Sequence, residues 1–133
     1  MALTGARGEQ GTIAMQRRID SGARQPRAAA RDVAILSALG APVDGTVQAF
    51  LLANAPQGGA RAEAGAMLAL ASAVERGAIG EGALLTVVAA GEGGPARLDA
   101  ESVERIIRAL RGLRLEDEAR RVAAEAILAG QPG

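Results

Sequence analysis

The strongest folding signal in this sequence is a helical pattern over residues 99–112, where large aliphatic residues recur at helical spacing. They stand at i, i+3, i+4 and i+7, and so share one face of a helix: Val103, Ile106, Ile107 and Leu110. Asp99 is the predicted N-cap, because its side chain can accept a hydrogen bond from a free amide of the first turn. Two i,i+4 ion pairs are predicted on the opposite side: Glu101–Arg105 and Glu104–Arg108.

Residues 115–129 repeat this scheme with smaller apolar side chains. The predicted inward stripe is Ala119, Val122, Ala123, Ala126 and Ile127. Two further i,i+4 ion pairs are predicted: Glu116–Arg120 and Asp117–Arg121. We expect Gly112 to end the preceding helix in a left-handed conformation. Because so few residues join the two helices, they are predicted to pack as an antiparallel hairpin.

Two shorter helices are predicted near the middle of the chain. Pro26 suits the first helical position and is followed by a helix over residues 27–39, with Val33, Leu36 and Leu39 inward. Asp44 is the predicted cap of a second helix over residues 44–53. Its core-facing residues are predicted to be Val47, Phe50, Leu51 and Leu52. The Gln57-Gly58-Gly59 segment that follows is the best candidate for a hinge.

Two apolar segments, residues 60–76 and 80–90, complete the pattern. The first is a predicted helix with a broad stripe: Ala60, Ala64, Met67, Ala71 and Val74, widened by Leu68 and Leu70. Gly77 is its predicted C-terminal stop. In the second segment, residues 86–88 would also suit a strand. We favour a buried helix there, because the chain offers no partner strand.

These patterns predict an all-α protein of about six helices in antiparallel hairpins, arranged as an α-solenoid-like stack or a small bundle. The expected organisation is an irregular, basic arm over residues 1–25 and a helical domain over residues 26–133, since the arm combines repeated glycines with no sustained periodicity. Apolar residues are 49% of the chain, but many are alanine and only Phe50 is aromatic. The predicted core is therefore thin, which favours reliance on a partner.

The last predicted hairpin resembles the tetratricopeptide family of α-hairpin repeats. The resemblance rests on Gly112-Leu113, on Glu118-Ala119 opening the second helix, and on the small Ala123 and Ala126 inside it. Each hairpin unit is about 31 to 35 residues long, which is in the range of such repeats. The resemblance covers the C-terminal half, lacks the aromatic positions of that family, and implies a scaffold or peptide-binding solenoid rather than an enzyme.

The missing residue types limit the chemistry of this chain. It has no histidine, cysteine or lysine, which excludes a Ser–His–Asp triad, a Cys–His pair, zinc sites of the usual type and a P-loop. Residues 91–96 match G-x-G-x-x-A, but no second strand follows, so a loop is the better interpretation. Acidic residues 116–118 point in different directions around a helix and make a poor metal site. We therefore predict no catalytic residue, no cofactor and no bound metal.

The charge of the chain is balanced overall but unevenly distributed. Residues 1–31 contain six arginines against Glu9 and Asp20, whereas the rest of the chain is acidic. Five of these arginines are candidates for binding an acidic protein partner or, as the alternative, nucleic-acid phosphates: Arg17, Arg18, Arg24, Arg27 and Arg31. The nucleic-acid alternative lacks interleaved aromatic residues that could stack on bases.

The apolar candidates for partner binding lie mainly on the short helix 44–53, which has the least core to cover it: Phe50, Leu51 and Leu52, together with Met67. No segment is apolar over the length of a membrane span, and no secretory pattern opens the chain, so a cytoplasmic location is expected. The function predicted from sequence is non-catalytic: a scaffold, adaptor or small assembly subunit.

Overall fold

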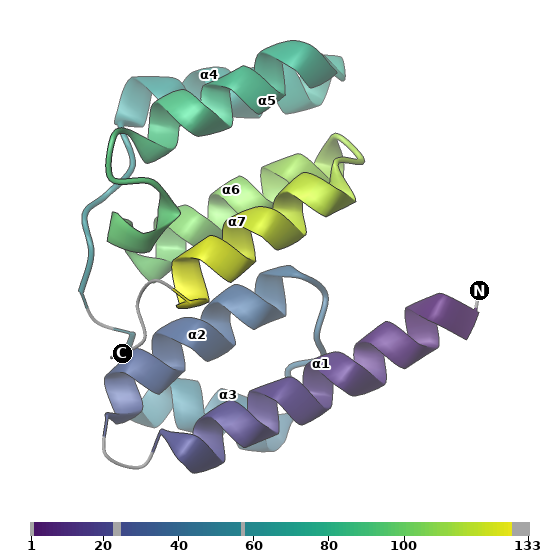
Figure 1. Cartoon of the computed structure of the whole chain (residues 1–133), viewed down its shortest axis with the longest axis vertical. Helices are drawn as coiled ribbons and strands as arrows, with labels where there is room; N and C mark the ends of the chain where they lie inside the picture. Colours follow the sequence, from purple (N-terminus) through teal and green to yellow (C-terminus); the bar gives the residue numbers. More distant parts are fainter. Residues whose placement is uncertain (1, 23–24, 57, 129–133) are drawn as a thin grey trace. The chain divides into compact units, whose positions relative to one another are not determined.

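The computed structural model describes residues 2–22, 25–56 and 58–128, and these residues are predominantly helical (Figure 1). The predicted all-α fold class is confirmed. The chain divides into two compact units, Met1–Gln57 and Gly58–Gly133, each of which is described by itself. The boundary falls within the glycine segment predicted as a hinge, and motion at that hinge stays a prediction.

The first unit contains α1 (Ala2–Ser21), α2 (Pro26–Ala38) and α3 (Gly45–Ala53), and each helix contacts the other two. A small apolar core joins them. Its buried members are Met15, Val33, Ala41 and Val47, and Ile19, Leu36, Phe50 and Leu51 pack around these. Helix α3 begins as predicted, because Asp44 Oδ1 accepts a hydrogen bond from the Val47 amide at 2.9 Å.

The predicted irregular arm over residues 1–25 is where the structure departs furthest from the sequence analysis, because residues 2–21 form α1. Met15 and Ile19, one helical turn apart, pack into the core of the unit. A Cβ atom at Gly11 would lie 2.8 Å from Ala41 Cβ, so this glycine stands where α1 closely approaches the chain after α2. Glycines that indicated an irregular segment thus include one at a tight helix contact.

The second unit contains α4 (Ala64–Arg76), α5 (Ile79–Ala90), a short 3-10 helix η1 (Pro95–Arg97), α6 (Ala100–Gly112) and α7 (Glu116–Leu128). Helix α4 packs against α5, α6 packs against α7, and both α4 and α5 contact α6. The predicted stripe of α6 is confirmed, since all four of its large aliphatic residues are buried. Of the stripe predicted for α7, Ala119, Ala123 and Ala126 are buried, whereas Val122 and Ile127 are half-buried.

The N-cap of α6 also forms as predicted. Asp99 Oδ1 accepts a hydrogen bond from the Ser102 amide at 2.8 Å. On the exposed side, Glu101–Arg105 and Glu104–Arg108 form ion pairs of 2.7 and 2.9 Å. Glu116 instead pairs with Arg111 Nε at 3.1 Å, across the connection between α6 and α7.

Helix α4 begins four residues later than the sequence predicts. Glu63 caps it by accepting hydrogen bonds from the amides of Gly65 and Ala66. Residues 60–62 run alongside the chain before α6, where Ala60 forms a parallel bridge with Leu98. Gly59 has φ +96°, and a Cβ there would come within 2.5 Å of the Leu98–Asp99 backbone, so only glycine fits this approach.

The broad stripe predicted for residues 60–76 is wrong in detail. The buried residues of α4 are Ala66, Leu70 and Ala73, whereas Leu68 is 75% exposed. The predicted stop at Gly77 is confirmed by its left-handed φ of +66°.

The end of α6 also differs from the prediction. Arg114, rather than Gly112, takes the left-handed conformation with φ +63°. Gly112 lies within the helix, and a Cβ there would be 3.1 Å from Val74 Cγ1 of α4. The absence of a side chain at this position therefore serves helix packing rather than termination.

Candidate functional site

The arginines predicted to contact a partner do not form one surface. Arg18 Nε donates to Asp32 Oδ2 at 2.6 Å, and Arg31 Nη1 lies 4.0 Å from the other oxygen of the same buried carboxylate. Arg18 thus joins α1 to α2, whereas Arg31 belongs to α2 itself and lies beside the same carboxylate. Arg17 and Arg27 are exposed, and Arg24 lies outside the described residues.

The three apolar candidates on α3 differ in how deeply they are buried. Phe50 and Leu51 are half-buried and pack against the core of the first unit. Leu52 is 81% exposed, so its predicted position in the core is wrong. A single exposed leucine is common on protein surfaces, and it does not mark a binding site by itself.

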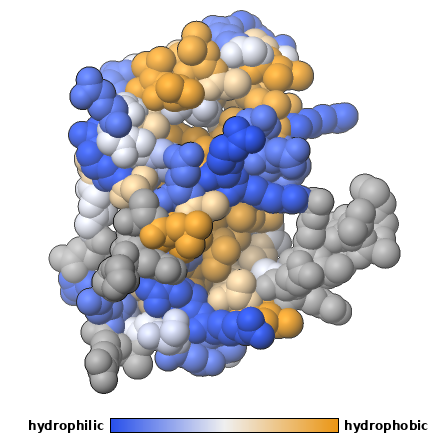
Figure 2. Space-filling view, in the orientation of Figure 1, coloured by the Kyte–Doolittle hydropathy of each residue, from blue (hydrophilic) through white to orange (hydrophobic). Residues whose placement is uncertain are grey.

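A larger apolar surface lies on the second unit, along the solvent side of α5. We call it the α5 outer face; it consists of Leu84, Val87 and Val88, with exposed fractions of 66%, 67% and 53%. These residues are spaced at i, i+3 and i+4, so they lie together on one side of the helix. Figure 2 shows hydrophobic side chains gathered over the region of α4 and α5.

The inward side of α5 is made of smaller residues. Its buried residues are Gly82, Thr86, Ala89 and Ala90. The Thr86 hydroxyl donates a hydrogen bond to the Ala83 carbonyl at 2.7 Å, so this buried polar group has a partner. A Cβ at Gly82 would overlap Leu113 Cδ1, which explains why the small side of the helix faces inward. The sequence analysis correctly favours a helix here but wrongly predicts its large residues as buried. The missed signal was the separation of large and small residues onto opposite sides.

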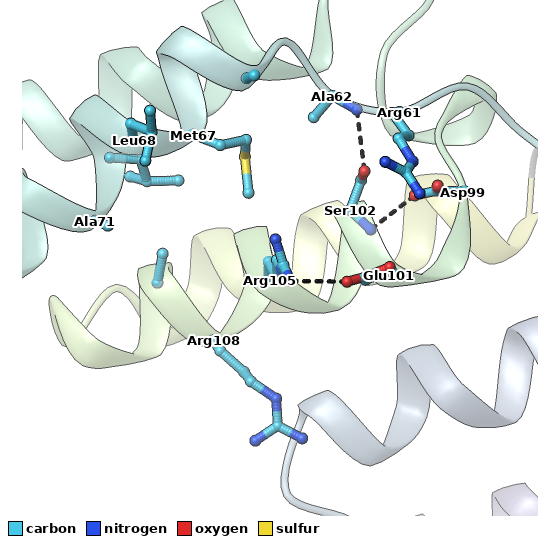
Figure 3. A pocket seen from close by; sticks show the side chains of 13 residues that line it. Arg61, Ala62, Met67, Leu68, Ala71, Asp99, Glu101, Ser102, Arg105 and Arg108 are labelled. Atoms are coloured by element: carbon cyan, nitrogen blue, oxygen red, sulfur yellow. Dashed lines mark hydrogen bonds and ion pairs between the residues drawn. The ribbon is translucent and has the colours of Figure 1, made fainter.

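A groove of about 620 Å³ runs between α4 and α6. Figure 3 shows Met67 reaching from α4 toward α6, where Ser102 and Arg105 lie. The apolar part of its lining comes mostly from α4, including Leu68 and Ala71.

The polar groups of this groove are largely engaged within the chain. Ser102 Oγ accepts a hydrogen bond from the Ala62 amide at 3.0 Å, and Asp99 caps α6. Arg105 is held by Glu101, as Figure 3 shows. This arrangement contains no pairing of a nucleophile with a base, and its polar contacts are those that fix residues 60–63 to the start of α6.

One carboxyl group near the groove has a perturbed pKa. The Gly65 amide, and then the Ala66 amide, lower the pKa of Glu63 by donating hydrogen bonds to its charged form. Because both donors belong to the first turn of α4, the cause is helix capping. The shift therefore belongs to the fold of the second unit rather than to a reaction.

The glycine loop at residues 91–96 follows a helix, α5, rather than the strand that a dinucleotide fold requires. The side chain of Arg97 packs over it, since a Cβ at Gly93 would lie 2.6 Å from Arg97 Cδ. Pro95 and Ala96 then join η1 and line a second hollow of about 440 Å³ beside α7. The loop thus has the character predicted for it, that of a connection.

Comparison of the chain with protein-family models, with curated proteins and with solved structures finds no match in any of the three. None of the helices within the described residues has the length and apolar character needed to cross a membrane. Those same residues include no cluster of three or more acidic side chains placed to hold a metal ion.

Proposed function

We propose that this chain is a non-catalytic assembly subunit that associates with a protein through the α5 outer face. The observation that carries the proposal is the orientation of α5. This helix directs Gly82 and Ala89 inward and leaves Leu84, Val87 and Val88 in water. A helix selected only for the stability of its own unit would bury its larger aliphatic residues.

The arrangement of the three residues strengthens this argument. Isolated exposed aliphatic residues are normal on a protein surface, but a contiguous group on one helix is typical of an association site. No charged residue occupies the helix between Leu84 and Val88. A protein partner would therefore remove this surface from water without removing a charge from water.

The proposal also includes the finer architecture predicted from the sequence. In this architecture, α4 and α5 form one antiparallel hairpin, α6 and α7 form the next, and the two hairpins stack as in α-solenoid scaffolds. The contacts within each pair, the short connections and the contact of α6 with both α4 and α5 support this arrangement. The α5 outer face would then be a surface left open at the end of the stack.

The non-catalytic part of the proposal rests on residue chemistry. The chain has no histidine or cysteine, which supply the usual general base and thiolate nucleophile at neutral pH. The polar side chains lining the α4–α6 groove include a helix cap and ion-paired arginines. These features support an interaction role better than a reaction.

The test is a pull-down of the tagged full chain from its source cells, in the presence of a second copy carrying a different tag. Val87→Glu places a charge in the α5 outer face. Val43→Glu is the matched control, because Val43 is an exposed valine of the first unit. We expect wild type and Val43→Glu to recover a stoichiometric protein, either the second copy or another chain, and Val87→Glu to lose it. Equal recovery by all three baits, or no partner at all, contradicts the proposal.

A nuclease-treated sample tests the nucleic-acid alternative in the same experiment. Recovery that disappears with nuclease would favour that alternative. The Arg18–Asp32 ion pair argues against it, because this contact holds Arg18 within the first unit. Arg17→Ala would then be the decisive variant, since Arg17 is exposed on α1.

A further inference from the structure

We propose that Met67 is a site of oxidation to methionine sulfoxide, and that the sulfoxide loosens the packing of α4 against α6. Met67 lies on α4, is half-buried and lines the α4–α6 groove. The site does not involve the α5 outer face, so its test is independent of the proposed function.

The composition of the chain directs an oxidant to methionine. The chain has no cysteine, so a thioether is the only kind of sulfur group it contains, and it also lacks histidine, tryptophan and tyrosine. Methionine is therefore the residue type at which we expect a peroxide to react. The three methionines are Met1, Met15 and Met67, of which Met1 lies outside the described residues.

The two described methionines differ in their access to solvent. Met15 has no exposed surface and belongs to the core of the first unit, together with Val33 and Val47. Met67 instead lines the open groove, and Figure 3 shows its side chain extending from α4 toward α6. A peroxide can reach the Met67 sulfur in the folded chain, whereas it reaches Met15 only when the first unit opens.

The reaction with hydrogen peroxide is a transfer of one oxygen atom. A lone pair of the Met67 sulfur attacks one peroxide oxygen, the O–O bond breaks, and the other oxygen leaves as water after proton transfer. The sulfur is oxidised by two electrons and the peroxide is reduced by two, while both C–S bonds stay intact. A methionine sulfoxide reductase supplied with a thiol reductant returns the thioether.

Helix α4 has few large side chains with which to pack. Its apolar residues larger than alanine are Met67, Leu68, Leu70 and Val74. Leu68 is 75% exposed, so the other three carry the packing of α4. Oxidation converts one of these three from a flexible apolar side chain into a polar one.

The added oxygen changes what Met67 requires of its surroundings. A sulfoxide oxygen accepts hydrogen bonds, and leaving it without a partner at a half-buried position is destabilising. We expect the Met67 turn of α4 to move away from α6, so that water reaches the oxygen. The expected consequence is a more open α4–α6 groove.

The first experiment identifies the oxidised residue. The purified full chain is treated with hydrogen peroxide, digested with trypsin and followed by mass spectrometry. Because trypsin cleaves after arginine, each methionine falls in its own peptide: residues 1–7, 8–17 and 62–76. Sulfoxide should form in peptide 62–76 at least about ten times faster than in peptide 8–17, and at equal rates in both when the chain is unfolded in urea. Equal rates in the folded chain, or protection of Met67, would overturn the assignment.

The second experiment tests the structural consequence. Peroxide treatment should lower the melting temperature of wild type by about 4 to 8 °C and speed amide hydrogen exchange in α4, and the reductase should reverse both changes. Met67→Leu keeps an apolar side chain of similar size and removes the sulfur, so peroxide should leave its melting curve unchanged. Met15→Leu is the matched control and should respond to peroxide as wild type does.

Two outcomes would overturn the consequence assigned to the sulfoxide. If peroxide destabilised Met67→Leu as much as wild type, the effect would arise at another methionine. If oxidised wild type kept its hydrogen exchange in α4, the sulfoxide would be accommodated without loosening the helix.

Discussion

Replacing Gly82 with alanine should destabilise the second unit, although alanine is the better helix former. Gly82 is buried on the inward side of α5, and an added Cβ would overlap Leu113 Cδ1. Leu113 is 3% exposed, so its side chain cannot move aside without repacking its neighbours. Gly80 offers the matched control, because a Cβ there meets nothing within 4 Å on the same helix.

The expected magnitude is a balance of two terms. Alanine in place of glycine stabilises a helix by about 0.5 to 1 kcal/mol. Overpacking a tight contact costs about 1 to 3 kcal/mol. Gly82→Ala should therefore lower the free energy of unfolding by about 1 kcal/mol, whereas Gly80→Ala should leave it unchanged or raise it by up to about 0.5 kcal/mol. For a unit of this size, each kcal/mol shifts Tm by about 4 to 8 °C.

The assay is urea denaturation of the full chain followed by far-ultraviolet circular dichroism, since the chain has no tryptophan or tyrosine for fluorescence. A Leu113→Val background removes the Cδ1 atom that causes the overlap. In that background Gly82→Ala should lose most of its cost, which a double-mutant cycle measures.

Two results would refute this reasoning. If Gly82→Ala and Gly80→Ala changed stability equally, the contact with Leu113 would not determine the packing of α5. If Gly82→Ala were equally destabilising in both backgrounds, its cost would arise elsewhere than at Leu113 Cδ1.

Three further outcomes are expected from other contacts. Asp99→Ala should lower the free energy of unfolding by about 1 kcal/mol in urea melts, because the Ser102 amide loses its acceptor, while Asp99→Ser should keep most of the stability. Arg18→Met should destabilise the first unit by about 1 to 3 kcal/mol and increase hydrogen exchange in α1, because it weakens the pairing of buried Asp32; Arg17→Met should not. The Gly65 and Ala66 amides lower the pKa of Glu63, so its charge stabilises α4 above the ordinary pKa of 4.5, and this contribution is lost as pH falls through the lower folded-state value. The difference in melting temperature between wild type and Glu63→Gln should therefore shrink progressively as the pH is lowered below 4.5.

The parts of the fold that sequence reasoning predicted best are those built from large aliphatic residues. In α6, Val103, Ile106, Ile107 and Leu110 leave one plausible inward face, and all four are buried. Asp44 and Asp99 each precede an apolar helical pattern, and each caps that helix as predicted. The spacing of large apolar residues and the chemistry of capping side chains determine these faces and caps, so both can be predicted without the tertiary structure.

The remainder depended on contacts between distant residues. In α4, alanine lies on opposite sides of the helix, and in α5 the small residues rather than the large ones face inward, so a stripe of large residues does not mark the inward face of either helix. The orientation is set by close approaches, such as Gly82 to Leu113 and Gly112 to Val74. The helix α1 was missed for a related reason, since Gly11 indicates irregular chain until its neighbour Ala41 is known.

The candidate site was missed because the usual rule for finding a core helix face predicts the opposite orientation of α5. Burying a valine or leucine side chain contributes about 1.5 to 3 kcal/mol, so turning Leu84, Val87 and Val88 inward would be favourable if space allowed. The structure indicates that space does not allow it, because even one added methyl group at Gly82 overlaps Leu113. The large residues of α6 fill the shared core, and α5 supplies small ones to meet them.

This division of α5 into two sides makes stability and association separable. A substitution on the inward side, Gly82→Ala, should change the unfolding free energy without altering the exposed residues of the α5 outer face. A substitution on the outer face, Val87→Glu, should abolish association while leaving the melting curve of the monomer nearly unchanged, because Val87 is 67% exposed. If Val87→Glu instead unfolded the purified chain, the outer face would belong to the core, and an interaction role for it would be untenable.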